Sequence, residues 1–285
     1  MYVRFILFPK KIIDMEQALQ RRVQRYGWDK AALYYETFWQ DQLRPAQDLL
    51  LEMAQLQPGE KVLDVACGTG LVSFRASDAV KSGGFVIGTD ISDKMVEMAS
   101  AIAGEKKYSA VAFSRMDGEE LQFPDADFDA VLCSLGLMYM PDPLKALKEM
   151  HRVLKPGGRI VAAVWGRRDH CGWAEIFEIV DKRVASEVCP MFFNLGFPDR
   201  LSLFLETAGY TNISSQTIST NLHYASDEDA CGAAFAGGPV ALAYNKFSDL
   251  VKAEAHAEYL ASMSEYKNNE GYDVPGEFVV AKGFK

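Results

Sequence analysis

The chain has 285 residues, of which 49% are hydrophobic and 24% are charged, a composition typical of a globular protein with one large domain or a domain with a cap. Its formal net charge of -9 and the absence of a basic stripe argue against a nucleic-acid ligand, because phosphate groups require basic surface. No apolar run reaches the roughly 18 residues that a membrane span needs, and the run from Phe5 to Phe8 is too short for a signal peptide.

The cysteines indicate a reducing compartment. They are odd in number and form no C-x-x-C pair: Cys67, Cys133, Cys171, Cys189 and Cys231. Reduced thiols in a cytoplasmic protein are the simplest explanation, and no metal site is expected.

The first predicted element is an aromatic helix from Trp28 to Trp39, which also contains Tyr34, Tyr35 and Phe38. An aromatic stripe at helical spacing most often packs on a sheet. The same faces can also surround a bound cation, and both interpretations can hold at once.

The most informative stretch is Val-Leu-Asp-Val-Ala-Cys-Gly-Thr-Gly at residues 62–70. Its apolar run predicts a strand buried on both faces, and Gly68 and Gly70 bracket a turn that leads into a helix from Leu71. Glycine lets a ligand approach the bare backbone. Asp64 interrupts the apolar run, so we expect its carboxylate to point toward the open end of the strand. The pattern predicts a nucleoside-type cofactor above the first strand of an open α/β sheet.

A second buried strand, from Gly84 to Asp90, ends in an acid 20 residues after Gly70. At this spacing a carboxylate accepts hydrogen bonds from the two hydroxyl groups of a ribose. The alternative is that Asp90 or Ser92 only caps the helix that follows. If Asp90 binds the ribose, two nearby residues would face the adenine ring, Ile91 and Met95. The alternative is that both belong to the ordinary core of the helix.

Three more strands and a helix follow. The strands are expected at Ala110 to Asp117, Asp129 to Leu135 and Gly158 to Trp165. The helix from Leu144 to Leu154 follows an Asp-Pro start signal and ends at Lys-Pro-Gly-Gly.

These motifs resemble those of the class I S-adenosylmethionine-dependent methyltransferases. Residues 62–70 are close to that family's L-D-x-G-C-G-T-G, with Ala66 where glycine is usual. Residues 121–129 and 149–158 resemble two further family signatures. Gly-Leu-Met-Tyr-Met-Pro-Asp at 136–142 is partly similar to the G-L-R-N-x-x-D segment of the ubiquinone and menaquinone C-methyltransferases.

The resemblance implies a Rossmann-like, doubly wound α/β sheet of seven strands, mostly parallel with the last strand antiparallel, and a helical cap made by insertions. It implies S-adenosylmethionine as cofactor. Asp117 would accept from the adenine amino group, the backbone at Ser134 would meet the methionine half, and Trp28 to Tyr35 would enter a lid. The expected cofactor-binding residues are Asp64, Ala66, Gly68, Gly70, Asp90, Ile91, Met95, Asp117, Gly118, Ser134 and Tyr35.

The domain organisation is expected in three parts. Residues 1–50 would form an N-terminal helical lid, residues 51–165 the cofactor-binding core, and residues 166–285 the remaining strands with the substrate cap. The last part would contain a helix at 199–208, strands at about 211–219 and 277–284, and a mostly helical stretch at 227–266 broken at Gly237–Pro239. The insertions at 166–198 and 220–276 would cover the carboxyl ends of the strands.

The expected chemistry is an in-line methyl transfer to a small, partly apolar molecule, in which the enzyme supplies alignment and excludes water. A base is needed only for a hydroxyl or weakly acidic carbon acceptor. Many relatives carry His-His where this chain has Met138-Tyr139. The candidate catalytic residues are therefore His170, His223 and Tyr139, whereas His151 is expected to face solvent or the helix dipole and His256 to be exposed.

Two alternatives remain open. The first is an NAD(P)-dependent oxidoreductase, which the serine at the third glycine position (Ser73) and the place of Asp117 disfavour. The second is a methyltransferase-like protein that binds partners without turnover, which the intact acidic and glycine motifs disfavour. The sequence leaves open the methyl acceptor and the oligomeric state, a homodimer included.

Overall fold

The computed structural model describes residues 10–81, 83–184 and 192–285, with the backbone alone at residues 10–15. The run from Phe5 to Phe8 and Cys189 lie outside the described residues. The sheet order is β3-β2-β1-β4-β5-β8-β6. The strands are β1 Lys61–Val65, β2 Phe85–Asp90, β3 Val111–Arg115, β4 Phe128–Ser134, β5 Leu154–Trp165, β6 Thr211–Tyr224 and β8 Gly271–Phe284, and the short β7 Lys267–Asn268 pairs with β8.

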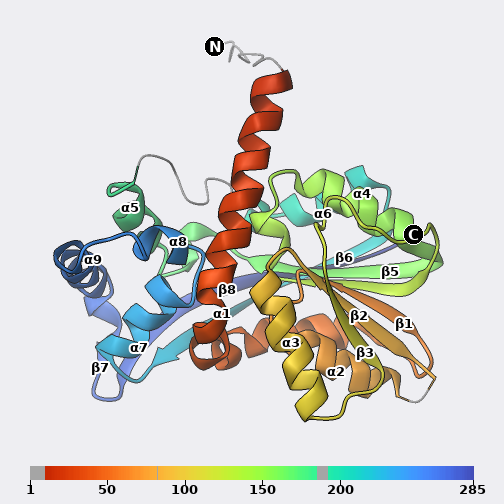
Figure 1. The fold of residues 1–285 in the computed structure, drawn as a ribbon, viewed down its shortest axis with the longest axis horizontal. Helices are drawn as coiled ribbons and strands as arrows, with labels where there is room; N and C mark the ends of the chain where they lie inside the picture. The colour runs from red at the N-terminus through yellow and green to blue at the C-terminus, as the bar shows by residue number, and fades with distance from the viewer. Residues whose placement is uncertain (1–9, 82, 185–191) are drawn as a thin grey trace.

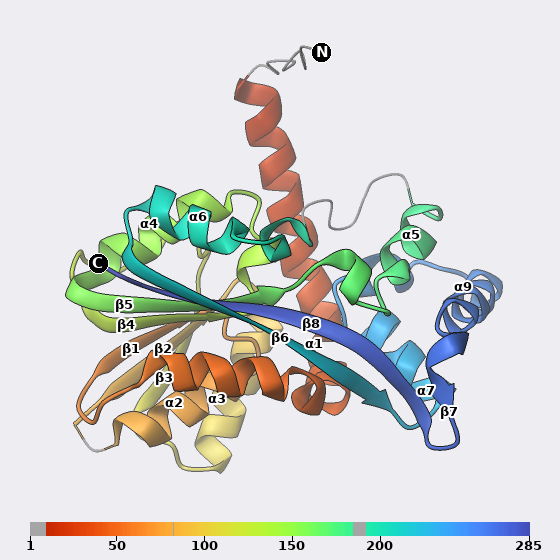
Figure 2. The ribbon, with the colours of Figure 1, turned by 180° about the vertical axis from the view of Figure 1, so that it is seen from behind.

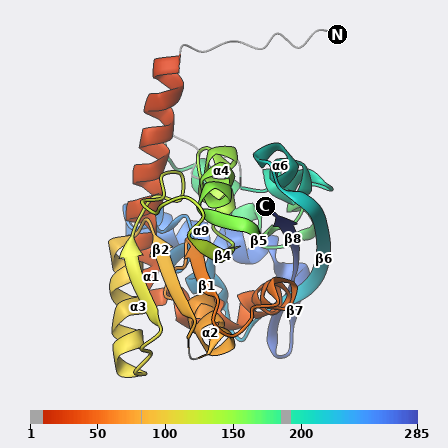
Figure 3. The same cartoon turned by 90° about the vertical axis from the view of Figure 1, so that its right-hand side faces the viewer.

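The predicted fold class is confirmed. Strands β3, β2, β1, β4 and β5 run parallel, while β8 is antiparallel to both β5 and β6. Seen from the side, β3 and β6 lie at opposite edges of the sheet (Figure 3). The central strands are apolar because both of their faces are covered, and Val62, Val131 and Val161 are fully buried.

Helices cover both faces of the sheet (Figure 2). The last part of α1 lies on the same face as α2 and α3, and α4 and α6 lie on the other. The helices are α1 Lys10–Ala54, α2 Leu71–Val80, α3 Asp93–Glu105, α4 Pro143–Val153, α5 Glu175–Asp181, α6 Arg200–Ala208, α7 Asp227–Cys231, α8 Ala241–Tyr244 and α9 Asp249–Ser262.

Helix α1 is much longer than the predicted aromatic segment, with 45 residues. Its first part projects away from the sheet (Figure 1), and the helix bends before its last part lies along the sheet (Figure 2). Pro45 inside the helix has no backbone N–H to donate to the carbonyl of Asp41, which gives a physical reason for the bend.

The C-terminal strands are longer than predicted. Strand β6 continues to Tyr224 rather than ending at 219, and β8 begins at Gly271 rather than at 277. The two strands form a long antiparallel ribbon that extends beyond the parallel strands, with α7, α8 and α9 beside it (Figure 1). Part of the expected insertion at 220–276 is therefore sheet.

Candidate cofactor and substrate site

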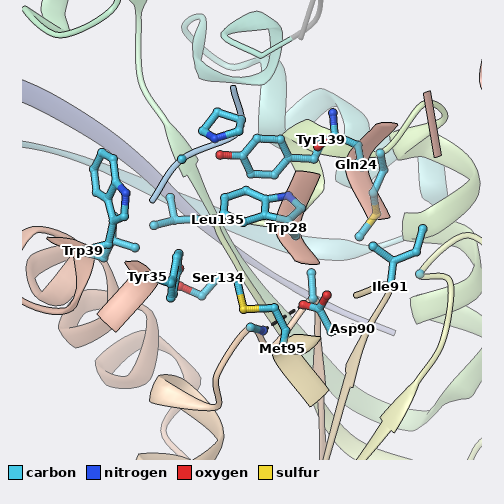
Figure 4. A pocket seen from close by; sticks show the side chains of 18 of the residues that line it. Gln24, Trp28, Tyr35, Trp39, Asp90, Ile91, Met95, Ser134, Leu135 and Tyr139 are labelled. Atoms are coloured by element: carbon cyan, nitrogen blue, oxygen red, sulfur yellow. Dashed lines mark hydrogen bonds between the residues drawn. The ribbon is translucent and has the colours of Figure 1, made fainter. Parts of the chain in front are cut away.

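A cavity lies where the parallel strands end, between the sheet and α1 (Figure 4). Its lining comes from the first part of α1, the β1–α2 loop and the residues that follow β2, β3, β4 and β5. Ligands of open α/β sheets bind at this edge, next to the point where the strand order reverses. Here that point lies between β1 and β4, which are neighbours in the sheet.

The β1–α2 loop presents bare backbone to the cavity. Ala66 and Gly68 line it, with φ angles of 58° and 56°. Gly70 does not line it. A Cβ atom at Gly70 would lie 2.8 Å from the ring of Phe74, so the glycine is required there by packing beneath the loop. Gly68 therefore faces the ligand side, whereas Gly70 shapes the turn.

Asp90 lines the cavity from the end of β2 and is 7% exposed. One carboxylate oxygen accepts from the backbone N–H of Gly68 at 2.9 Å (Figure 4), and the other accepts from that of Ser92 at 2.9 Å. Burial raises the pKa of Asp90 to about 6. Ser92 caps α3 with its own hydroxyl, which accepts from the backbone of Met95 at 3.1 Å. Asp90 is therefore not needed as the cap of α3: it fixes the glycine loop and lines the cavity.

Asp64, which the sequence predicts to point toward the open end of its strand, is not part of the cavity lining. It is fully buried, and one carboxylate oxygen accepts from the hydroxyl of Ser73 at 2.6 Å. The other oxygen has no hydrogen-bond partner among the described residues. Burial, together with the nearby Asp90, raises the pKa of Asp64 to about 7. The carboxyl group is thus a buried partner of the first turn of α2 and not a part of the cavity lining.

Asp117 also lies outside the lining, although Met116 and Gly118 on either side of it are part of the lining. One of its oxygens lies 3.2 Å from Nε of Arg21, a residue of α1 that lines the cavity. Arg21 also pairs with Glu119, which is 1% exposed. The acid expected for the adenine amino group is thus tied to the long helix.

Three aromatic rings meet above the loop. The ring of Trp28 lies edge-on to those of Tyr35 and Tyr139, at centroid distances of 5.8 and 5.1 Å (Figure 4). Ile91, Met95 and Ser134 complete this end of the cavity. The hydroxyl of Ser134 is buried without a hydrogen-bond partner in the described chain.

The histidines lie elsewhere. Nδ1 of His170 lies 2.6 Å from a carboxylate oxygen of Glu277, and Nδ1 of His223 lies 3.1 Å from one of Asp273. Neither histidine lines the cavity, so of the three catalytic candidates the structure brings only Tyr139 to it. His151, which lies in the last turn of α4, and His256, which was expected to be exposed, are both half-buried. Tyr210 packs against the first, and the Tyr244 hydroxyl lies 3.0 Å from Nε2 of the second.

The far end of the cavity was largely missed from the sequence. It is lined by Trp39, Leu43, Leu135, Trp165, Trp173, Gly238 and Pro239. These residues come from α1, from the ends of β4 and β5, and from segments far along the chain. The available signals were the aromatic residue that ends the fifth apolar strand and the Gly-Gly-Pro break in the C-terminal helices.

A family comparison agrees with this arrangement. Residues 38–194, more than half of the chain, match the ubiE/COQ5 methyltransferase family. The chain belongs to this family. The matched residues contain the glycine loop, Asp90 and the ends of all five parallel strands, so the family resemblance expected from the motifs is confirmed.

Two curated relatives illustrate the range of this family's neighbours. The demethylmenaquinone methyltransferase of Lysinibacillus sphaericus is 38% identical over 140 residues, covering 48% of this chain and 57% of that protein. The nocamycin O-methyltransferase of Saccharothrix syringae is 35% identical over 133 residues, covering 47% of this chain and 48% of that protein. This chain thus spans about half the length of the curated relatives it matches.

The YcgJ protein from Bacillus subtilis is similar in structure. It aligns with a TM-score of 0.60 and 21% sequence identity over 85% of this chain and 98% of that chain. At this level of identity, the similarity shows that the two chains share a fold. In the described residues no helix is both long and apolar enough to cross a membrane.

Proposed function

We propose that this chain transfers a methyl group from S-adenosylmethionine to a small, partly apolar molecule. The observation that carries the proposal is that one cavity joins two chemically different ends. One end has a buried carboxylate and a bare glycine loop, as a nucleoside requires, and the other is apolar and aromatic. Donor and acceptor would lie side by side, which is the arrangement an in-line displacement needs.

The residues at the first end fit the donor. Asp90 would hold the ribose hydroxyl groups, and Gly68 would let the nucleoside lie against the backbone. Ile91, Met95 and Gly118 would surround the adenine ring. Ser134, with its unpaired buried hydroxyl, would meet the methionine half. A bound ligand would satisfy this oxygen, whose burial is otherwise unfavourable.

The roles of the remaining predicted cofactor residues follow from their places. Asp64 and Gly70 would act indirectly, by supporting the loop from below. Asp117 would reach the adenine amino group only while it shares its carboxylate with Arg21. This contact ties α1 to the cofactor end and supports the hypothesis that residues 1–50 act as a lid.

S-adenosylmethionine supplies a methyl group on a positively charged sulfur that departs as a neutral thioether. The protein would align the acceptor and exclude water. The rings of Trp28, Tyr35 and Tyr139 would favour positive charge near their faces. Tyr139 is also the candidate for contact with the acceptor, because no histidine of the described chain lines the cavity.

Calorimetric titration of the purified chain with S-adenosylhomocysteine tests the donor site. We expect binding, and no heat at micromolar protein would contradict the proposal. A parallel titration with NAD tests the oxidoreductase alternative, which predicts binding of NAD and no binding of S-adenosylhomocysteine. Incubation of metabolite extracts with methyl-labelled donor then tests transfer. Binding of S-adenosylhomocysteine without transfer to any metabolite would favour the non-catalytic alternative.

A further inference from the structure

Three tryptophans form a cluster at the far end of the cavity. Trp39 lies on α1, Trp165 ends β5, and Trp173 precedes α5. Their ring centroids lie 6.1 Å (Trp39–Trp165), 6.2 Å (Trp39–Trp173) and 4.7 Å (Trp165–Trp173) apart. None of the three side chains is more than 6% exposed, yet all three line the cavity.

Two of these tryptophans have a buried N–H group that donates to nothing in the described chain. They are Trp39 and Trp173. An indole N–H can only donate, and leaving a buried donor unpaired costs about 1–3 kcal/mol. Native proteins rarely leave such groups unpaired without a reason. Nε1 of Trp39 lies beside Gly237, where a Cβ atom would be 3.3 Å away, next to Gly238 and Pro239 of the lining.

The surroundings of the two donors restrict what can accept from them. Among the residues that the structure describes, the charged members of the lining are Arg21 and Asp90, and both lie at the cofactor end. An anionic acceptor molecule would be buried near the tryptophans without a cation to pair with, which is costly. A cation is favoured by ring faces but disfavoured by the positive N–H edges of the indoles. A neutral, flat molecule carries no charge to be buried unpaired, can stack on the rings, and can accept from both N–H groups if it has acceptor oxygens.

We propose that the indole N–H groups of Trp39 and Trp173 donate hydrogen bonds to oxygen atoms of a neutral, flat methyl acceptor and thereby select it. The inference rests on the proposed function, because it places the acceptor next to the donor site. Ring stacking would hold the plane of the molecule, and the two N–H groups would fix its orientation. The substrate class is then an uncharged ketone, phenol or ether rather than an amine, an acid or a phosphate.

Nuclear magnetic resonance tests the proposal on the unmodified protein. The chain has four tryptophans, so a ¹⁵N-labelled sample gives four indole N–H signals that single Trp→Phe variants assign. S-adenosylhomocysteine is added first to saturation. The probes follow: 2-acetyl-6-methoxynaphthalene, which has two acceptor oxygens, and 2,6-dimethylnaphthalene, which has none. We expect the signals of Trp39 and Trp173 to move downfield with the first probe only.

Affinities of the same probes provide the second measurement. Trp39→Phe and Trp173→Phe keep an aromatic ring and remove the N–H donor. Each should therefore lower the affinity for the oxygen-bearing probe about three- to tenfold, as expected for one lost hydrogen bond. Binding of the hydrocarbon should not weaken in parallel. Trp28→Phe at the cofactor end is the matched control, and it should leave the ratio of the two affinities unchanged.

Charged analogues complete the test. 6-Methoxy-2-naphthoate and (6-methoxynaphthalen-2-yl)methylammonium should bind more weakly than the neutral ketone. Indole signals that do not move with the ketone, or a charged probe that binds more tightly, would overturn the inference. Signals that already move with S-adenosylhomocysteine alone would assign the two donors to the cofactor and overturn it as well. Absence of S-adenosylhomocysteine binding would instead contradict the proposed function.

Discussion

Replacing Asp64 by asparagine should stabilise the protein increasingly as the pH rises. The Asp64 carboxyl group is fully buried, and its folded-state pKa is raised to about 7 from an ordinary value of 3.8, mainly by burial. Between these pH values the folded protein holds a proton that the unfolded chain has lost. The free energy of unfolding of the natural protein therefore falls as the pH rises through this interval, whereas asparagine does not titrate.

The size of the effect follows from that interval. A pKa difference of this size corresponds to an upper limit of about 4 kcal/mol. Asparagine can still accept from Ser73 but places an amide group where an oxygen lacks a partner, so the Asp64→Asn variant carries a constant cost at every pH. The prediction therefore concerns the pH dependence of the difference between the two proteins, not its value at one pH.

Urea denaturation of both proteins at pH 4, 6 and 8 measures this difference. We expect the stability of Asp64→Asn relative to the natural protein to increase from pH 4 to about pH 7 and to level off above it. Asp41→Asn, at a side chain that is 85% exposed, removes the same charge from a solvated position and serves as control. A difference that does not change with pH would show that Asp64 ionises as easily in the folded protein as in the unfolded chain, and would refute the reasoning.

Three further substitutions test the site. Asp90→Ala leaves the backbone N–H groups of Gly68 and Ser92 without acceptors and removes the ribose contact, so calorimetry should show S-adenosylhomocysteine affinity reduced by about 2–3 kcal/mol; unchanged affinity would contradict the site. Ala66 has a left-handed backbone conformation, which costs an alanine about 1–2 kcal/mol. Ala66→Gly removes this cost but makes the unfolded chain more flexible, so thermal unfolding should show a net gain in stability of about 0.5 kcal/mol, with cofactor binding kept. Arg21→Met removes the partner of a buried glutamate, and the free energy of unfolding should fall on the order of 3 kcal/mol in urea; a loss no larger than that of an exposed ion pair would rule out this contribution.

The parallel core could be predicted from the sequence because its strands are covered on both faces. A doubly covered strand reads as a continuous apolar run, and the runs beginning near Val62 and Ala130 are of this kind. The place of Asp90 could be predicted because one helix, one turn and the short strand β2 lead to it from Gly70, so the spacing is constrained locally. The structure brings its side chain to the cavity, as expected.

The remaining features depend on contacts between distant segments. The extension of β6 to Tyr224 does alternate, with Leu222 and Tyr224 buried between exposed residues, but the alternation covers only five residues, and pairing with β8 is what continues the strand. Asp64 accepts a hydrogen bond from the buried hydroxyl of Ser73 on the following helix and does not line the cavity. Trp173 reaches the cavity through a segment whose local pattern carries no periodic signal.

The length of α1 has a consequence for the order in which ligands would leave the cavity. The same continuous helix contributes Arg21 and Trp28 to one end of the cavity and Trp39 and Leu43 to the other. Ligand exchange by a swing of this helix would therefore expose both compartments together. Because one helix lines both ends of the cavity, the spent donor and the methylated product would not have separate exit routes. Their release would therefore be kinetically linked.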